Sequence, residues 1–548
     1  MPFYGVPIEI PNRSLTSLLI VEPTLGIDSS QPSVDAPLGS TPQSENFIMR
    51  EGGLEPRPVL QLRNANPQPM NVPVTGGWEF ADTLNNRFPV VSGTTRLAWF
   101  STGSWSVMSY VSAAGINDPP NGSSTSYWDA TQIYYADRDQ NIAIFANGSY
   151  QSLYCAEIGT NVFSSLTGAP RAKFVTAFDN YLLAFNTRDP GSANSEYVQR
   201  VQWNDRGSAS SWTGGLAGFE DLLAMRGQGT RIMAQDNRVI LFSDKEIWQG
   251  FPSNFPFVFR FEPLDRSVGC PYSWTISDTP RGLIFLARNL QTYLLPKEGG
   301  TAVPIGQRLY RTIRESIDAP ERAWAVYDPA TDQHQLYYPT LGGSGFPQKA
   351  VYLNLTEGSW APQTFDPLSG GISLTRGFAV TGLAESSSAT SWDGAGAAGF
   401  TWDTAGRTWD SFGTQTTTAD RRDVYLGSSA GTVYLYDSGA TSDNGTPVTA
   451  RWRSTALWGE MPGREKTVTE WRADYQANSA SSLTLKFSQT QGASFDAGVG
   501  LALPTNSALS QAVAYPYTSS RFPMFQVESE GWRYRLFRFY LTARLGGR

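Results

Sequence analysis

Short apolar runs separated by tight polar turns recur along most of the chain. A typical stretch is TAFDNYLLAFNTRD (176–189), in which the pair Asp179-Asn180 separates two apolar runs. The pattern returns in RIMAQDNRVILFSDKEIWQG (231–250), and NIAIFANGSYQSLY (141–154) places Asn-Gly, a strong hairpin signal, between two runs. The repeated unit predicts β-strands joined by hairpins, with Asp179 and Asn180 as turn residues and not as a functional site.

Matching aromatic residues in successive units reveal a long period. Phe145, Phe185, Phe242, Phe285 and Tyr337 follow one another at intervals of 40, 57, 43 and 52 residues. A four-stranded blade takes about 40–50 residues, so this spacing predicts a β-propeller of about six blades. A β-sandwich is the alternative, because its strands also recur at short spacing, although without a period of this length.

The next interval, from Tyr337 to Tyr425, is 88 residues long and leaves room for a further unit or an insertion. It contains a Gly/Ser-rich stretch near 386–409. Such composition predicts a long surface loop or an irregular blade.

The pattern changes on both sides of the predicted propeller, which we place at 91–445. Residues 1–90 mix short extended pieces with a Ser/Pro-rich stretch, and they are predicted to form an N-terminal arm. This arm includes a docking hairpin at SENFIMREGGLEPRPVLQL (44–62). Residues 446–548 contain alternating runs such as YRLFRFYLTARL (534–545), which predict a separate, sandwich-like antiparallel β-domain.

Composition favours an all-β fold. Aromatic residues make up 13% of the 548 residues, and 52 Gly with 35 Pro interrupt the chain too often for long helices. The formal net charge of -7 argues against a surface that grips nucleic acid through its phosphates, although DNA can still pass along such a wall. We see no signal-peptide pattern and no apolar run of about 18 residues, so we expect a cytoplasmic protein without a membrane-spanning segment.

Few residues offer catalytic or metal-binding chemistry. His334 is the single histidine and is predicted to be an ordinary residue on or beside a hairpin turn. Cys155 and Cys270 lie outside any CxxC or Cys/His cluster, and we interpret both as buried thiols. SDNG (442–445) and DRDQN (137–141) lack the spacing of a calcium loop and are interpreted as solvated turns.

Carboxylates need separate consideration because some propellers are glycosidases. WNDRGSASSW (203–212) and TWDTAGRTW (401–409) approach the Asp-box pattern S-x-D-x-G-x-T-W, but both miss its spacing. Asp boxes also stabilise turns and lie away from catalytic centres. The sequence therefore predicts no catalytic, cofactor-binding or metal-binding residue and no cofactor, and we expect the protein not to be an enzyme.

Three segments carry a resemblance to tail proteins of short-tailed bacteriophages. SENFIMREGGLEPRPVL resembles their leader, with an Asn, a strand, Gly-Gly-Leu-Glu and Arg-Pro. TGAPRAKFVTAFDNYLLAFNTRD and VQRVQWNDRGSASSW resemble their propeller segment, and RWRSTALWGEMPGREKTVTEWRADY resembles the opening of their C-terminal β-domain. The matching positions of the propeller segment are Ala169, Pro170, Asp179, Arg200, Val201, Trp203, Asp205, Gly207 and Trp212.

LFSDKEIWQG (241–250) and GCPYSWTISDTPRGLIFLARNLQTYLL (269–295) extend the resemblance to about residue 296, so that in separated pieces it covers about half the chain. On these pieces the protein resembles the tail nozzle family, also called tail tubular protein B or tail hub. The resemblance implies a structural virion protein that forms a homo-hexamer below the portal and adaptor ring. Such a nozzle is a conduit and gate for DNA ejection, without sequence recognition, and a platform for fibres, spikes or a needle. It implies a place in the virion tail after assembly in the host bacterial cytoplasm, and it carries over no catalytic residue.

Two other functions stay open at this point. One is a carbohydrate-binding or glycan-cleaving propeller protein. The other is a generic propeller scaffold in a non-viral bacterial complex.

Overall fold

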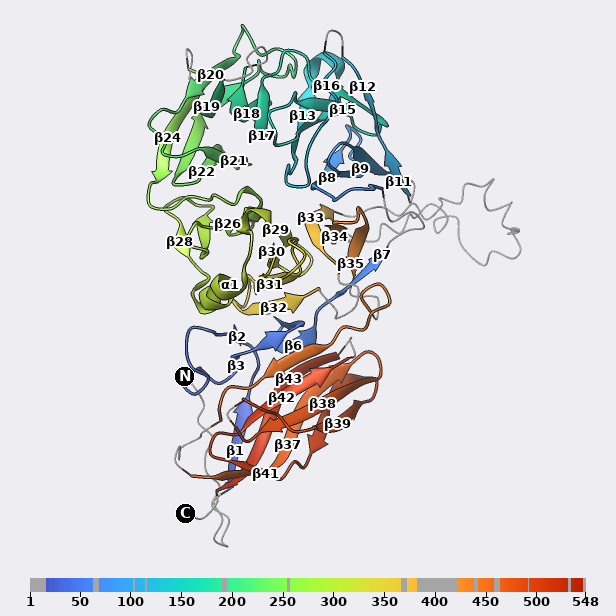
Figure 1. Ribbon diagram of the computed structural model, residues 1–548, viewed down its shortest axis with the longest axis vertical. Helices are drawn as coiled ribbons and strands as arrows, with labels where there is room; N and C mark the ends of the chain where they lie inside the picture. The colour runs from blue at the N-terminus through green and yellow to red at the C-terminus, as the bar shows by residue number, and fades with distance from the viewer. Residues whose placement is uncertain are drawn as a thin grey trace, which may run out of the picture.

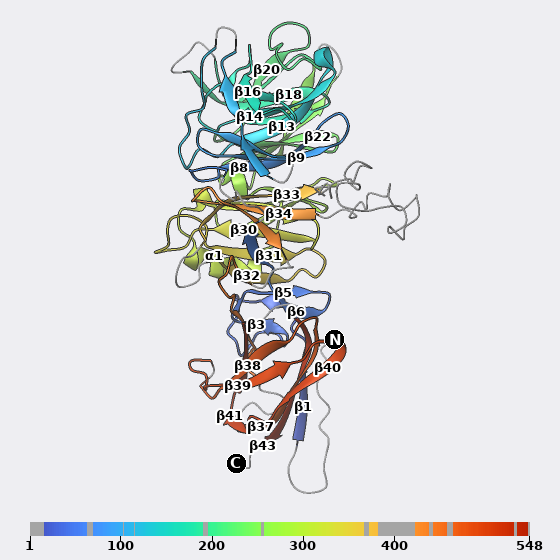
Figure 2. The ribbon, with the colours of Figure 1, turned by 90° about the vertical axis from the view of Figure 1, so that its right-hand side faces the viewer.

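The computed structural model describes residues 16–62, 69–101, 104–113, 116–189, 195–253, 257–365, 372–381, 422–437, 442–457, 464–490, 492–530 and 534–545. These residues form a propeller, in the upper part of Figure 1, and a β-sandwich below it. Figure 2 shows the hairpin of β5 (Phe47–Arg50) and β6 (Gly53–Pro56) at the level where the two meet. The all-β propeller fold predicted from the sequence is confirmed.

Seven sheets surround the propeller axis, and the first strands of neighbouring sheets pack together around it. Blade one contains β8 (Gly76–Ala81), β9 (Arg87–Ser92), β10 (Leu97–Ser101) and β11 (Ser104–Val107). Blade two contains β13 (Asp129–Tyr135), β14 (Gln140–Ala146), β15 (Tyr154–Glu157) and β16 (Val162–Ser165), with a parallel edge strand, β12 (Ser109–Val111). Blade three contains β17 (Arg171–Phe178), β18 (Tyr181–Arg188), β19 (Glu196–Trp203) and β20 (Gly218–Asp221).

The remaining blades follow in chain order. Blade four contains β21 (Gly229–Gln235), β22 (Arg238–Ser243), β23 (Ile247–Pro252) and β24 (Phe259–Asp265); blade five contains β25 (Ser277–Thr279), β26 (Gly282–Leu286), β27 (Thr292–Pro296) and β28 (Val303–Pro304). Blade six contains β29 (Trp324–Asp328), β30 (Gln333–Tyr338), β31 (Lys349–Asn354) and β32 (Trp360–Thr364); blade seven contains β33 (Leu374–Thr381), β34 (Arg422–Ser428), β35 (Val433–Asp437) and β7 (Val59–Leu62). Short helical segments are η1 (Ala136–Arg138), η2 (Ser273–Thr275), η3 (Gln307–Leu309), α1 (Tyr310–Ser316) and η4 (Pro320–Arg322).

The aromatic period marks the second strand of six blades. Its residues, Phe145, Phe185, Phe242, Phe285, Tyr337 and Tyr425, lie on β14, β18, β22, β26, β30 and β34, and all are buried. The expected number of about six blades is corrected to seven, because blade one has no residue in the aromatic series. The buried part of β9 carries Val90 and Val91 instead of an aromatic ring, and Pro89 interrupts its strand pattern.

Turn chemistry was predicted correctly at one hairpin and wrongly at another. Asp179 and Asn180 have φ of 48° and 60° and join the paired residues Phe178 and Tyr181, which confirms them as turn residues. The Asn-Gly pair at 147–148 does not form a two-residue hairpin, because β14 and β15 are separated by residues 147–153. The Asn147 side chain instead accepts a hydrogen bond from the Ser149 amide at 3.1 Å, which makes a local Asx turn.

The N-terminal part of the chain closes the propeller. Strand β7 pairs antiparallel with β35, with Leu60 opposite Tyr436, and supplies the outer strand of blade seven. At the axis β33 packs against β8, where Gly77 faces Phe378. A Cβ at Gly77 would lie 2.0 Å from the Phe378 ring, so only glycine fits this contact between the last and first blades.

Two sheets form the sandwich. The larger contains β40 (Asn506–Ala514), β37 (Lys466–Ala477), β43 (Tyr534–Leu545), β6, β5, β1 (Thr16–Val21) and β41 (Thr518–Ser520). The smaller contains β39 (Val499–Leu503), β38 (Ser481–Ser488), β42 (Met524–Ser529), β36 (Ala450–Arg453) and β4 (Ser44–Glu45), and β2 (Gly26–Ile27) pairs separately with β3 (Ser40–Thr41). Trp452 of the smaller sheet and Phe539 of the larger lie 5.4 Å apart between ring centroids, within the sandwich core.

These elements shift the predicted domain boundaries. The described residues within 1–90 do not form a separate arm: β1, β4, β5 and β6 belong to the sandwich, β7 to blade seven, and β8 and β9 to blade one. The predicted hairpin within 44–62 does form, as β5 and β6. The sandwich therefore combines residues 446–548 with strands from the start of the chain. The stretch 386–409 lies outside the described residues.

One buried cation holds the junction together. The Arg57 guanidinium donates from Nη1 to Asp443 Oδ1 at 3.1 Å, from Nε to Asn46 Oδ1 at 3.1 Å and from Nη2 to the Thr364 carbonyl at 3.1 Å. Asp443 also accepts from Arg57 Nη2 and, at 2.7 Å, from the Leu60 amide. Both charged side chains are buried, so the prediction that the 442–445 stretch is a solvated turn is wrong for Asp443.

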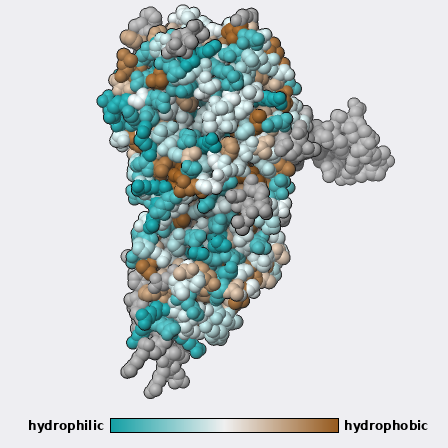
Figure 3. All heavy atoms as spheres, viewed as in Figure 1, coloured by the Kyte–Doolittle hydropathy of each residue, from teal (hydrophilic) through white to brown (hydrophobic). Residues whose placement is uncertain are grey.

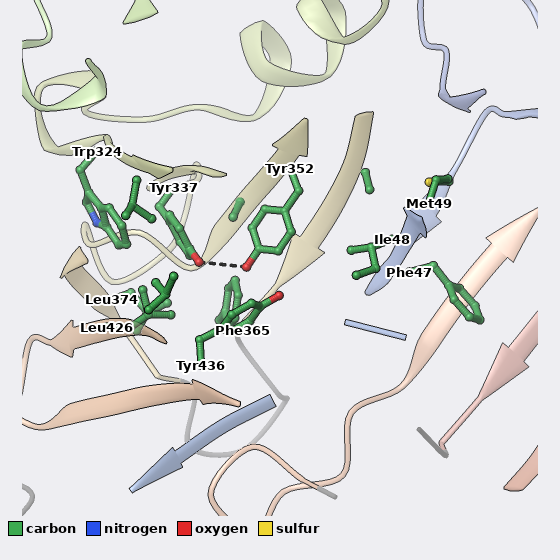
Figure 4. Packing of buried hydrophobic residues seen from close by; sticks show 14 of the residues in the cluster. Phe47, Ile48, Met49, Trp324, Tyr337, Tyr352, Phe365, Leu374, Leu426 and Tyr436 are labelled. Carbon is green, nitrogen blue, oxygen red and sulfur yellow. Dashed lines mark hydrogen bonds between the residues drawn. The ribbon is translucent and has the colours of Figure 1, made fainter. Parts of the chain in front are cut away.

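Apolar packing continues across the same junction. Figure 4 shows Phe47, Ile48 and Met49 of β5 beside Tyr352, Phe365 and Tyr436 of blades six and seven, and all belong to one buried cluster that extends to Trp452 and Trp471. The backbone of β5 is also fixed: the carbonyls of Phe47 and Met49 accept from Gln363 at 2.9 Å and from Asn354 at 3.0 Å. The two domains thus share one core.

We predict that Arg57→Met lowers the free energy of unfolding by about 3–5 kcal/mol, because Asp443 then stays buried without its partner. The double variant Arg57→Met/Asp443→Leu should recover most of that loss, since no unpaired charge remains. Denaturant unfolding measures the stability of both variants. Arg260→Met is the control, because the Arg260 side chain is 74% exposed. Equal stability of wild type and Arg57→Met would contradict the structural role assigned to this ion pair.

Candidate functional site

The single histidine is a core residue. His334 lies on β30, within the β29–β30 hairpin, and is 1% exposed. Its Nδ1 lies 2.6 Å from Ser277 Oγ of blade five, and burial lowers the pKa of the imidazole to about 3. The residue stays neutral at neutral pH and joins two neighbouring blades.

Neither cysteine has the environment of a reactive thiol. Cys270 is buried, and burial raises its pKa to about 12; Cys155 is partly buried, and burial raises its pKa as well. The interpretation as buried thiols holds fully for Cys270 and in part for Cys155. The described residues contain no group of three or more His, Cys, Asp or Glu side chains that could hold a metal ion.

The Asp-box-like stretch 203–212 is a turn that braces blade three. Asn204 Oδ1 accepts from the Leu182 amide at 2.5 Å, while its Nδ2 donates to the Ser208 carbonyl at 2.9 Å. Asp205 Oδ1 accepts from the Leu216 amide at 2.9 Å. All these contacts are internal to the blade, which agrees with a turn-stabilising role. The second such stretch, 401–409, lies outside the described residues.

The outer rim of blades three and four carries an apolar cleft of about 620 Å³. Strand β20 and the segment leading into β24 form its walls, with Phe219 and Phe257 57% and 69% exposed. Glu220 also lines the cleft, and burial raises the pKa of its carboxyl. Figure 3 shows hydrophobic residues in patches on the propeller among a largely polar surface. Two phenyl rings left in solvent favour contact with an apolar partner.

The walls of this cleft are held rigidly. The Arg200 guanidinium lies 4.2 Å from the Phe219 ring centroid, and its Nε donates to Asp221 Oδ1 at 2.7 Å. Trp203 donates from Nε1 to the Leu216 carbonyl at 2.9 Å. The exposed Phe219 ring is thus presented by a fixed strand, β20.

A second apolar surface lies on the larger sandwich sheet. A cross-strand row on its outer side joins Val513, Arg472, Tyr540 and Ile20, one from each of β40, β37, β43 and β1. Ile20 and Val513 are 47% and 38% exposed, and Tyr515, just after β40, is 63% exposed. Apolar side chains therefore lie at both ends of a row whose middle is charged and polar.

Side chains close the propeller axis. Arg231 of blade four reaches Asp129 of blade two, with Nη2 3.0 Å from Oδ1, although blade three separates these blades. Arg376 of blade seven and Arg231 both place their guanidinium carbon 4.3 Å from the Trp274 ring centroid. Residues of distant blades meet in this way only at the centre of the ring, so the axis of the propeller is not an open tunnel there.

Comparisons with known proteins give no family and only distant likenesses among solved structures. No protein-family model and no curated protein matches the sequence. Among solved structures, the chain is similar to YCF48 from Cyanidioschyzon merolae (10% identity, TM-score 0.37, 69% of this chain and 98% of that chain). BamB from Moraxella catarrhalis (10%, 0.34, 71% and 93%) and the Pan2 WD40 domain of Neurospora crassa (7%, 0.33, 66% and 88%) are similar at the same level. All three TM-scores lie below 0.5, and we base neither the fold nor an activity on these likenesses.

Sequence reasoning found none of the surfaces described above. Arg200, Trp203 and Asp205 were singled out for their pattern, and they brace the rim cleft, but nothing in the pattern marked Phe219 or Phe257 as exposed.

No helix in the described part of the chain has both the length and the hydrophobicity to cross a bilayer.

We predict that His334 makes stability depend on pH below neutrality. An unfolded histidine titrates near pH 6.5 and the folded one near 3, so between these values the unfolded state binds the extra proton and stability falls as pH falls. Wild type should lose about 2 kcal/mol more than His334→Gln between pH 7 and pH 5 in denaturant unfolding. Parallel pH profiles of the two proteins would contradict this.

Proposed function

We propose that this chain is a structural subunit of the tail nozzle of a short-tailed bacteriophage. Six copies form a ring below the portal and adaptor, which conducts and gates DNA during ejection and holds fibres, spikes or a needle. The observation that carries the proposal is that the segments resembling the nozzle family are the ones that fix the propeller to the sandwich and brace one blade.

The leader-like segment lies at the domain junction. The Asn and the Arg-Pro of the resemblance are Asn46 and Arg57-Pro58, and here Asn46 and Arg57 share a hydrogen bond of 3.1 Å inside the protein. Glu51 and Gly52, with φ of 50° and 72°, make the β5–β6 turn, and Gly53 begins β6 opposite Arg50. A ring subunit under load needs a fixed angle between its domains, and this hairpin supplies it.

The propeller-like segment forms the framework of blade three. Asp179 lies in the β17–β18 turn, and its Oδ1 accepts from Arg206 Nη2 at 2.6 Å. Val201 and Trp212 are buried, in β19 and in the turn region that follows it. The family-like residues therefore support the strand that presents the rim cleft.

DNA in this proposal passes between subunits. Side chains fill the axis of each propeller, so a channel for a duplex has to lie at the centre of the ring of copies. The net charge of -7 favours passage over tight binding, because 49 acidic residues outnumber 42 basic ones and oppose the neutralisation of phosphates. Identical subunits with heterologous contacts close into such rings when the rotation allows it.

The proposal predicts a closed particle of six 60.0 kDa chains. Mass photometry and electron microscopy of the purified protein, alone and mixed with an adaptor ring, should show this particle as a six-fold ring. A monodisperse monomer with no affinity for the adaptor would contradict it. Hydrolysis or specific binding of a glycan, lost on one Asp or Glu substitution, would instead favour the carbohydrate-active alternative.

We predict that the rim cleft is covered by a neighbouring subunit. The double variant Phe219→Ser/Phe257→Ser should then lower the fraction of ring, while thermal unfolding of the monomer changes little because both side chains are largely exposed. Leu84→Ser is the matched control, since Leu84 is 81% exposed near the tip of the β8–β9 hairpin. An unchanged ring fraction in the double variant would remove the cleft from the subunit interface.

A further inference from the structure

The centre of the propeller holds more positive than negative charge. Arg231 is paired with Asp129, but Arg376 has no carboxylate within ion-pair distance among the described residues. Both guanidinium carbons lie 4.3 Å from the centroid of the Trp274 ring, so at most twice that distance separates them. Burial, together with the nearby Arg231 charge, lowers the pKa of Arg376 to about 9, so the group remains protonated at pH 7.

Donors at this centre lack acceptors. Nε and Nη1 of Arg231 and Nε and Nη1 of Arg376 are buried without a hydrogen-bond partner, as is the hydroxyl of Tyr127. The Tyr127 ring centroid lies 5.9 Å from that of Trp274, and burial raises the pKa of the phenol to about 12, so it stays a donor. Arg376 is 8% exposed. Unpaired buried donors of this kind are costly, and charged ones most of all.

Cation–π contact with Trp274 offsets part of this cost but accepts no hydrogen bond. An anion with several oxygen atoms would supply both the missing charge and the missing acceptors. The Arg231 side chain is 13% exposed, so the cluster is not sealed completely from solvent.

We propose that the propeller axis binds a small phosphate-type oxyanion between Arg231, Arg376 and the Tyr127 hydroxyl. The ion links the inner strands of blades four and seven, β21 and β33, and acts as a structural pin at the centre of the ring. The site is independent of the tail function proposed above.

Inorganic phosphate, added to phosphate-free protein at constant ionic strength with chloride as the balancing anion, should raise the melting temperature by at least about 2 °C. Arg376→Met should abolish this rise, and Arg260→Met, at an exposed arginine, should keep it. The same measurement is made with thymidine 5′-monophosphate in place of phosphate. A smaller rise in melting temperature than with phosphate indicates that the ligand is a free ion. A larger rise would show that the ligand is a nucleotide and overturn the small-ion assignment.

A rise of the same size in wild type and Arg376→Met, or none in wild type, would overturn the proposal. Diffraction from wild-type crystals grown with tungstate decides the matter even if Arg376→Met does not fold. An anomalous peak between the two guanidinium groups supports the site, whereas peaks confined to surface residues, an adventitious ion only, would overturn it.

Discussion

The ion pair between Arg57 and Asp443 is the contact on which the arrangement of the molecule depends. It joins the segment after the β5–β6 hairpin, the end of blade six and the linker that leads into the sandwich. Its charges are buried at the junction of the domains, where each needs the other and the surrounding hydrogen bonds. Since the next residues form β7, the same anchor positions the strand that closes blade seven.

Around this ion pair, the propeller and the sandwich pack into one continuous body. The propeller presents apolar rings at its rim, the sandwich presents apolar side chains on its outer sheet, and one buried cluster connects them. A subunit built in this way can carry force between contacts at its two ends without bending at the middle. That property suits the ring subunit proposed above.

The sequence predicted the parts of the fold that depend on local chemistry. The Asp179-Asn180 turn follows from turn residues and the propeller from the recurrence of aromatic residues, and the structure confirms both. The sequence did not reveal contacts between positions far apart in the chain. Strand β7 pairs with β35 (Val433–Asp437), near the other end of the chain, and completes blade seven. Asp443 pairs with Arg57, which lies 386 positions earlier. The cluster of Arg231, Arg376 and Trp274 was equally hidden, because only closure of the ring brings blades four and seven together.

The central claim is that the hairpin β5–β6 and Arg57 make the propeller and the sandwich one cooperative unit. Hydrogen exchange measured by mass spectrometry across a denaturant series tests this most directly. Peptides from β29–β31 of the propeller and from β37 and β43 of the sandwich should lose protection at the same denaturant concentration. Loss of protection in the sandwich at a clearly lower concentration, while the propeller stays protected, would contradict the account.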